Sequence, residues 1–322
     1  MARGTSRIEL RPRESPRRLS RPSGFETASV SVGLHGDVVR LLIGEENNKA
    51  LRDKIVGRGK TLFGKSRTDL EYSAIISISG RSQNNELSVS SMTATFPLIE
   101  LLRDGEILVV APRCRRYPDG THELNAKVYD HAGLKRRDFL LGDGISHVQT
   151  DAEGNLWVGY FDEGVFGNFG WESPVGASGL SCFTTAGRKI WDYQPPEGFE
   201  PISECYALNV SASGTWAYYY TDFPIAHVDS HRRVPCWSTE SSGGRAFAVG
   251  NGKVLLYGGY DERRTPCSLL RLDGGASEFI SDVSLVLPRE IDPTKDIVLG
   301  RGKELHVFLA DDWFVFSLDS LD

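Results

Sequence analysis

Carboxylates recur along this chain at one step of a repeated pattern, directly after an apolar run that reads as a β-strand. They are Asp162 with Glu163, Asp222, Asp261 with Glu262, and Asp311. Convergent carboxylates supply the oxygen ligands that hard cations take, and two carboxylates held close together shift each other's pKa and can act as acid and base. The pattern therefore suggests a polar-ligand rim, or a Ca²⁺ or Mg²⁺ site with Asp162, Asp222 and Asp261 as ligands. Aspartate is also a favoured turn residue, so simple turns are the alternative.

One unit of the pattern places arginines at this step instead. Arg113 and Arg115 follow the apolar run that ends near Ala111. A guanidinium pairs with carboxylate or phosphate through a fixed fork of donors. We therefore expect these arginines to form the cationic part of a polar binding surface.

A long glycine-rich loop follows Asp162 and extends to Ser178. It carries Phe166, Phe169, Trp171 and Glu172. Aromatic side chains on such loops often make a binding surface, because a rigid ring buries much area at little entropic cost. The other interpretation is that Phe166 and Trp171 fold back over a neighbouring part of the fold. The sequence leaves both open.

Two candidate catalytic residues stand near the starts of predicted first strands. His147 and Glu204 occupy these positions, with Glu100 at a third. A neutral histidine with carboxylates can serve as a general base or hold a metal, although a lone histidine on a strand is more often structural. No H-x-H, H-E-x-x-H or G-x-S-x-G pattern occurs, so zinc-protease and α/β-hydrolase chemistry lack support.

Residues 59–66 match the P-loop pattern G-x-x-x-x-G-K-[ST]. That chemistry needs a buried strand before the loop and a helix after it. Charged residues precede Gly59, and the alternation from Tyr72 onwards predicts a strand. We interpret 44–68 as a solvated insertion, which contains the one helical candidate of the chain near Asn48–Val56.

The elements that would position all these residues form an internal repeat. Each unit has an apolar strand, a tight glycine turn, a second strand and then a second hairpin. The turn glycines are spaced 38 to 69 residues apart, at Gly36, Gly105, Gly154, Gly214, Gly252 and Gly302. Six such units predict an all-β, single-domain β-propeller of six four-stranded blades, with five or seven blades and a pair of β-sandwiches as alternatives.

In a propeller the loops from second to third strands open on one face, so the carboxylates above are predicted to share that face. The last unit lacks a fourth strand. We expect an N-terminal strand, from Arg7–Arg11 or from Glu26–Val30, to complete it.

One blade carries a nameable resemblance. Asp151–Gly159 reads DAEGNLWVG and resembles the D-x-x-G-N-L-W-x-G signature of bacterial regulator-type and NHL-like propeller repeats, which is similar to that of lactonase and lyase propellers. Tyr160–Gly167 is similar to a segment of uncharacterised bacterial propeller proteins. The other units match the signature poorly. The resemblance implies a fold rather than an activity.

Composition and charge narrow the classes of function. The net charge is −6, but residues 1–24 carry seven arginines against two glutamates, which leaves −11 on residues 25–322. An acidic body argues against a nucleic-acid partner. No apolar run is long enough for a membrane-spanning helix. We predict a disordered basic leader over 1–24, a propeller over 25–322 and a cytoplasmic location, with five dispersed cysteines that form no disulfide framework.

Two functions remain open from the sequence. The first is a non-catalytic binding or scaffold propeller, holding a protein or a small polar ligand on the face with the Asp162–Ser178 loop. The alternative is a lyase or hydrolase acting on a sugar, lactone or peptide-like substrate at the channel mouth. No cofactor beyond a divalent cation is suggested, and the oligomeric state is left open.

Overall fold

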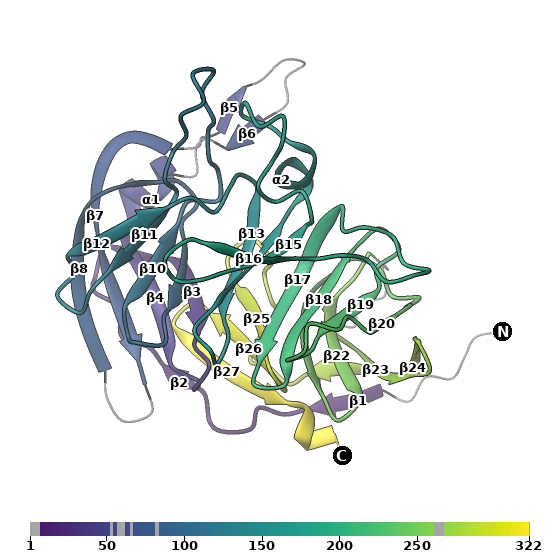
Figure 1. Cartoon of the computed structure of the whole chain (residues 1–322). Helices are drawn as coiled ribbons and strands as arrows, with labels where there is room; N and C mark the ends of the chain where they lie inside the picture. The colour runs from purple at the N-terminus through teal and green to yellow at the C-terminus, as the bar shows by residue number, and fades with distance from the viewer. Residues whose placement is uncertain are drawn as a thin grey trace. The chain divides into compact units, whose positions relative to one another are not determined.

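The structure, a computed structural model, describes residues 7–51, 54–56, 62–64, 67–80, 84–260 and 267–321. Regular structure in these residues is almost entirely β-strand (Figure 1). The chain divides into two compact units, Arg21–Tyr193 and Met1–Ser20 together with Gln194–Asp322. Each unit contains three sheets, and we describe each unit by itself.

The unit Arg21–Tyr193 holds three antiparallel sheets with their strands in chain order. The first consists of β3 (Phe25–Val32), β4 (Val38–Gly44), β7 (Arg67–Ser79) and β8 (Asn84–Ala94); the second of β9 (Leu98–Leu101), β10 (Ile107–Val110), β11 (Ala126–Tyr129) and β12 (Lys135–Phe139); the third of β13 (Ile145–Thr150), β14 (Leu156–Tyr160), β15 (Leu180–Phe183) and β16 (Lys189–Asp192).

Short elements are inserted into this unit. Helix α1 (Glu45–Leu51) and the hairpin of β5 (Lys54–Val56) and β6 (Leu62–Gly64) lie between β4 and β7, and α2 (Asp162–Phe166) follows β14. The P-loop interpretation is excluded, because the segment from Arg67 is a strand where phosphate binding needs a helix. Residues 59–61 and 65–66 of that pattern lie outside the described residues.

The second unit also holds three sheets. The first consists of β17 (Glu204–Ser211), β18 (Gly214–Tyr220), β19 (Ile225–Val228) and β20 (Cys236–Trp237); the second of β21 (Gly244–Gly250), β22 (Lys253–Gly258), β23 (Cys267–Asp273) and β24 (Ala276–Leu285), with β1 (Arg7–Leu10) added; the third of β25 (Ile297–Arg301), β26 (Glu304–Leu309) and β27 (Asp312–Ser317), with β2 (Arg17–Arg18) added. A 3₁₀ turn, η2 (Leu318–Leu321), follows.

These six sheets are the blades of a six-bladed β-propeller, so the predicted all-β fold and blade number are confirmed. All six predicted turn glycines have positive φ, from +55° at Gly302 to +126° at Gly214. Such φ values are open to glycine without steric cost, so the glycines fix where each blade turns.

The N-terminal segment differs from its predicted disorder in its described part. β1 pairs in parallel with β24, and β2 pairs in antiparallel fashion with β27. The last blade is therefore completed by Arg17–Arg18, rather than by Arg7–Arg11 or Glu26–Val30 as predicted. Two contacts hold the arginines: Arg13 Nη1 lies 2.8 Å from Glu304 Oε1, and the Arg17 guanidinium lies 5.3 Å from the centroid of the Trp313 ring. The N-terminal segment has the composition of a disordered one, but it is ordered by pairing with the edges of β24 and β27 and by its charge contacts.

In the unit Arg21–Tyr193, the second strand of each blade is almost completely buried. β10 and β14 are apolar runs with buried side chains on both faces, and β4 is apolar except for the buried Arg40, as expected for strands packed between neighbouring sheets. In the unit Arg21–Tyr193, one core lies between the first and second sheets and another between the second and third.

A buried carboxylate joins the first strands of this unit's three blades. Glu100 on β9 accepts a hydrogen bond from the hydroxyl of Ser31 on β3. It also accepts two hydrogen bonds from Thr150 on β13, one from the Thr150 N–H at 3.2 Å and one from the Thr150 hydroxyl at 2.8 Å. Glu100 is fully buried. It is therefore a structural link between first strands, and not a free carboxylate as its position in the sequence suggested.

Candidate functional site

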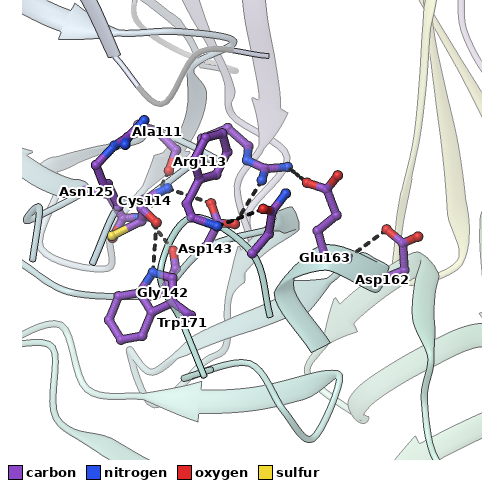
Figure 2. Close-up of polar contacts among 12 residues, drawn as sticks. Ala111, Arg113, Cys114, Asn125, Gly142, Asp143, Asp162, Glu163 and Trp171 are labelled. Atoms are coloured by element: carbon purple, nitrogen blue, oxygen red, sulfur yellow. Dashed lines mark hydrogen bonds and ion pairs between the residues drawn. The ribbon is translucent and has the colours of Figure 1, made fainter. Parts of the chain in front are cut away.

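Three loops of the unit Arg21–Tyr193 meet around one arginine. Arg113, in the loop after β10, forms an ion pair from Nη2 to Asp143 Oδ2 at 2.9 Å and a second from Nη1 to Glu163 in α2 (Figure 2). The side chains of Arg113 and Asp143 are buried, and that of Glu163 is about a quarter exposed. The ion triad, Arg113 with Asp143 and Glu163, therefore ties the 161–178 loop to the loops before β11 and β13.

Two aromatic rings cover the guanidinium of Arg113. Its central carbon lies 4.5 Å from the ring centroid of Phe169 and 5.2 Å from that of Phe161. Arg115 places its guanidinium 5.3 Å from the same Phe169 ring. Cation–π contacts of this kind strengthen where water is excluded. Arg113 and Arg115, which the sequence predicts as part of a polar binding surface, both contact the chain's own 161–178 loop.

Burial raises the pKa of Asp143 to about 6. The Arg113 guanidinium and the N–H groups of Cys114 and Gly144 oppose this shift, but the loss of solvent around the carboxyl outweighs them. Asp143 Oδ1 accepts the Cys114 N–H at 2.7 Å, so the carboxyl also fixes the backbone beside Arg113.

The shifted pKa of Asp143 predicts a pH dependence of stability. Between its ordinary value near 4 and about 6, the folded state binds the proton more tightly than the unfolded state, so the free energy of unfolding falls as pH rises through this window. The measurement is urea titration of wild type and Asp143→Asn from pH 4 to pH 7. Over this range, wild type is expected to lose on the order of 2 kcal/mol of unfolding free energy relative to Asp143→Asn. A difference that stays constant across this window would contradict the assignment.

Trp171 anchors the far part of the loop. Its Nε1–H donates to the carbonyl oxygen of Cys114 at 2.8 Å, and its ring is buried and stacks on that of His122 with centroids 6.1 Å apart. Asn125 supports the same region, because its amide donates to Ala111 and Gly142 and accepts from the N–H of Leu141. Trp171 thus folds back against the blade, the second of the two interpretations that the sequence left open.

Gly164 allows α2 to approach the loop of Asp143. A Cβ at this position would lie 2.4 Å from the carbonyl oxygen of Asp143 and 2.9 Å from the Cα of Gly144. Only a residue without a side chain fits here, so the glycine at position 164 is what allows α2 to pack closely against the loop of Asp143.

Phe166 is the exposed large apolar side chain of the 161–178 loop. Phe166, the last residue of α2, is 70% exposed. Asp162 and Glu172 are exposed as well, and Asp162 Oδ1 accepts the N–H of Glu163 at 2.7 Å. The loop therefore presents Phe166 on a segment that the ion triad and Trp171 hold in place.

The remaining predicted site residues lie apart from this cluster or outside the described residues. His147 is half-buried on β13, and Glu204 begins β17 in the other unit. Asp222 is exposed at φ +62° in the turn after β18, and Asp311 accepts the Leu19 N–H through its carbonyl oxygen. Asp261 and Glu262 fall in the undescribed segment 261–266.

The predicted metal ligands Asp162 and Asp222 belong to different units, and Asp261 is not described. Across the part of the chain that the structure describes, no group of three or more His, Cys, Asp or Glu side chains is arranged to hold a metal ion. None of the described helices is long and apolar enough to cross a membrane.

Sequence reasoning missed two features. The first is Asp143, the buried partner of Arg113. It lies between Gly142 and Gly144, and this sequence predicts a tight turn rather than an ion pair. The second is an aromatic cluster of the second unit, made of Tyr206, Tyr218, Tyr220, Phe223 and Tyr260. The dense run of tyrosines at 218–220 was its only visible signal.

Comparison with known proteins gives one family match to part of the chain and distant similarity to solved structures. A model of the YxzG family matches residues 177–262, and no curated protein matches the chain. Among solved structures, virginiamycin B lyase from Staphylococcus aureus is 12% identical, with a TM-score of 0.44, over 94% of this chain and 98% of that chain. AztD from Citrobacter koseri is 14% identical, with a TM-score of 0.43, over 92% and 84%. YCF48 from Cyanidioschyzon merolae is 10% identical, with a TM-score of 0.41, over 95% and 99%. Such similarity carries no information about activity.

Proposed function

We propose that this propeller is a binding protein that presents the 161–178 loop to a protein partner. The observation that carries this proposal is Phe166, a large apolar ring that is 70% exposed at the end of α2. An exposed ring on a loose loop would cost conformational entropy when it binds. Here the ion triad and Trp171 have already fixed the backbone, and preorganisation of this kind lowers the cost of binding.

The chemistry of the loop supports binding over catalysis. Asp143, whose pKa is raised to about 6 by burial, has a fully buried side chain. Arg113 and Glu163 are committed to internal ion pairs. These groups hold the loop in shape, whereas lyase or hydrolase chemistry, the alternative raised by the sequence, needs reactive groups that reach a substrate.

Replacing Phe166 with serine tests the proposal. If Phe166 is the central contact of an interface, its loss is expected to cost at least about 2 kcal/mol of binding, a reduction of roughly 30-fold in partner recovery during quantitative affinity capture. The matched control is Leu134→Ser, since Leu134 is 60% exposed in the turn between β11 and β12. Both variants should melt like wild type, because substitutions at exposed positions change stability little.

The outcome is decided by comparing three proteins. Partners recovered by wild type and by Leu134→Ser, but lost from Phe166→Ser, are expected. Equal recovery of every partner by all three proteins would remove the 161–178 loop from the binding surface.

A further inference from the structure

The second unit carries a cluster of exposed tyrosines built on one buried ring. Phe223, in the turn after β18, is buried, and three tyrosines surround it. Ring centroids lie 5.0 Å apart for Tyr206 and Phe223, 5.9 Å for Phe223 and Tyr260, and 5.5 Å for Tyr220 and Phe223. Tyr260 is 60% exposed and Tyr220 45% exposed. We call Tyr206, Tyr220, Phe223 and Tyr260 the tyrosine cluster.

The rings of Tyr206, Phe223 and Tyr260 meet nearly at right angles, whereas the Tyr220 ring is tilted by 55° to that of Phe223. Interplanar angles are 90° for Tyr206 and Phe223, 78° for Phe223 and Tyr260, and 88° for Tyr206 and Tyr260. Edge-to-face packing places the positive edge of one ring against the negative face of another, which is the favoured arrangement. The cluster thus combines ring faces in several orientations on one small surface.

Contacts beneath and beside the rings hold them in position. The hydroxyls of Tyr206 and Tyr260 are hydrogen-bonded to each other. Tyr218 stacks on Phe223 and donates from its hydroxyl to the carbonyl of Ser241 at 2.7 Å. A Cβ at Gly243 would approach the Tyr260 ring to 2.7 Å, so glycine there allows the ring its position. The exposed rings are therefore fixed before any ligand arrives.

Carboxylates accompany these rings. Glu204 pairs across the strands with Tyr220, and Asp222 is exposed in the turn between Tyr220 and Phe223. Burial, the hydrogen bond to Tyr260 and the charge of Glu204 raise the pKa of Tyr206, so its hydroxyl stays protonated at neutral pH. Ring faces and carboxylates both attract positive charge.

We propose that the tyrosine cluster, with Glu204 and Asp222, binds an organic cation of the trimethylammonium class. The methyl groups of such a cation bury apolar area against the rings, while its diffuse charge is attracted to their faces and to the carboxylates. A primary ammonium is more strongly hydrated and gives up its water less readily. A neutral sugar or a proline-rich segment would contact the rings without the charge attraction to Glu204 and Asp222.

Calorimetric titration of the full chain separates these ligands. The probe is choline, and its matched control is 3,3-dimethyl-1-butanol, which has the same shape without the charge. We expect choline to bind at least about tenfold more tightly than the neutral alcohol. Equal affinities for the two compounds, or no choline binding up to about 50 mM, would overturn the proposal.

Variants localise the binding of choline. Tyr260→Leu is expected to weaken it at least about tenfold, and Glu204→Gln about threefold. Phe166→Leu, which also removes an exposed ring but lies in the other unit, should leave it unchanged. Choline binding that survives Tyr260→Leu overturns the site. Binding of methyl glucoside or a polyproline peptide that depends on Tyr260, without choline binding, assigns the surface to a neutral ligand instead. The result is independent of the role of Phe166.

Discussion

Replacing Arg113 with alanine is expected to lower the free energy of unfolding by about 3–5 kcal/mol. The substitution removes the cation from a carboxylate, Asp143, whose side chain is fully buried. It also removes the guanidinium that packs between the rings of Phe161 and Phe169. Urea titration at pH 7 measures the effect, and the same sample is expected to show faster proteolysis within residues 161–178 as their anchor is lost.

A double variant separates charge from packing in this result. Arg113→Met together with Asp143→Asn removes both charges, keeps most of the volume, and retains an oxygen that can accept the Cys114 N–H. It is expected to recover most of the stability lost in Arg113→Ala, because removing both partners of a buried ion pair costs far less than removing one. A double variant as unstable as Arg113→Ala would show that the guanidinium stabilises the loops by means other than its charge.

Glu100→Ala is expected to cost about 3 kcal/mol of unfolding free energy. The substitution removes the buried carboxylate that accepts from the Thr150 N–H and the Ser31 hydroxyl, while the Thr150 hydroxyl keeps the Leu101 carbonyl oxygen at 3.2 Å as an acceptor. Equilibrium unfolding compared with Glu304→Ala is the measurement. Glu304 is a carboxylate whose ion pair with Arg13 is partly exposed, so its loss should cost less than about 1 kcal/mol. Similar small losses in both variants would show that Glu100 does not link the first strands of the three blades.

Most of the fold is readable from local sequence. Strand-turn-strand units such as LWVGY after Asn155, or GTWAYYY after Ser213, combine a turn glycine with β-branched and aromatic residues, and they fold as predicted. These signals are local, because positive φ at glycine and strand propensity depend on neighbouring residues. The same locality explains the failure at Arg7–Arg18, whose strands form only because β24 and β27 offer edges that are distant in the sequence.

The candidate site was predictable in part. Composition marked the 161–178 loop and Arg113, since aromatic residues among glycines and arginines after a strand are unusual in simple turns. The partners of these residues were not predictable, because the pairing of Arg113 with Asp143 depends on how two loops of adjacent blades approach. The tyrosine cluster escaped for the same reason: Tyr206, Tyr220 and Tyr260 come from three separate strand ends, and nothing in the one-dimensional pattern brings them together.

The pairing of β2 with β27 sets an order of events during protein synthesis. Arg18 and Asp312 are 294 positions apart, so a ribosome that adds 5–20 residues per second emits the second partner roughly 15–60 s after the first. Throughout that interval β2 has no β27 to join, and the nascent chain exposes an arginine-rich segment that is ready to pair. Ribosome-associated chaperones would therefore encounter this segment before the last blade can form.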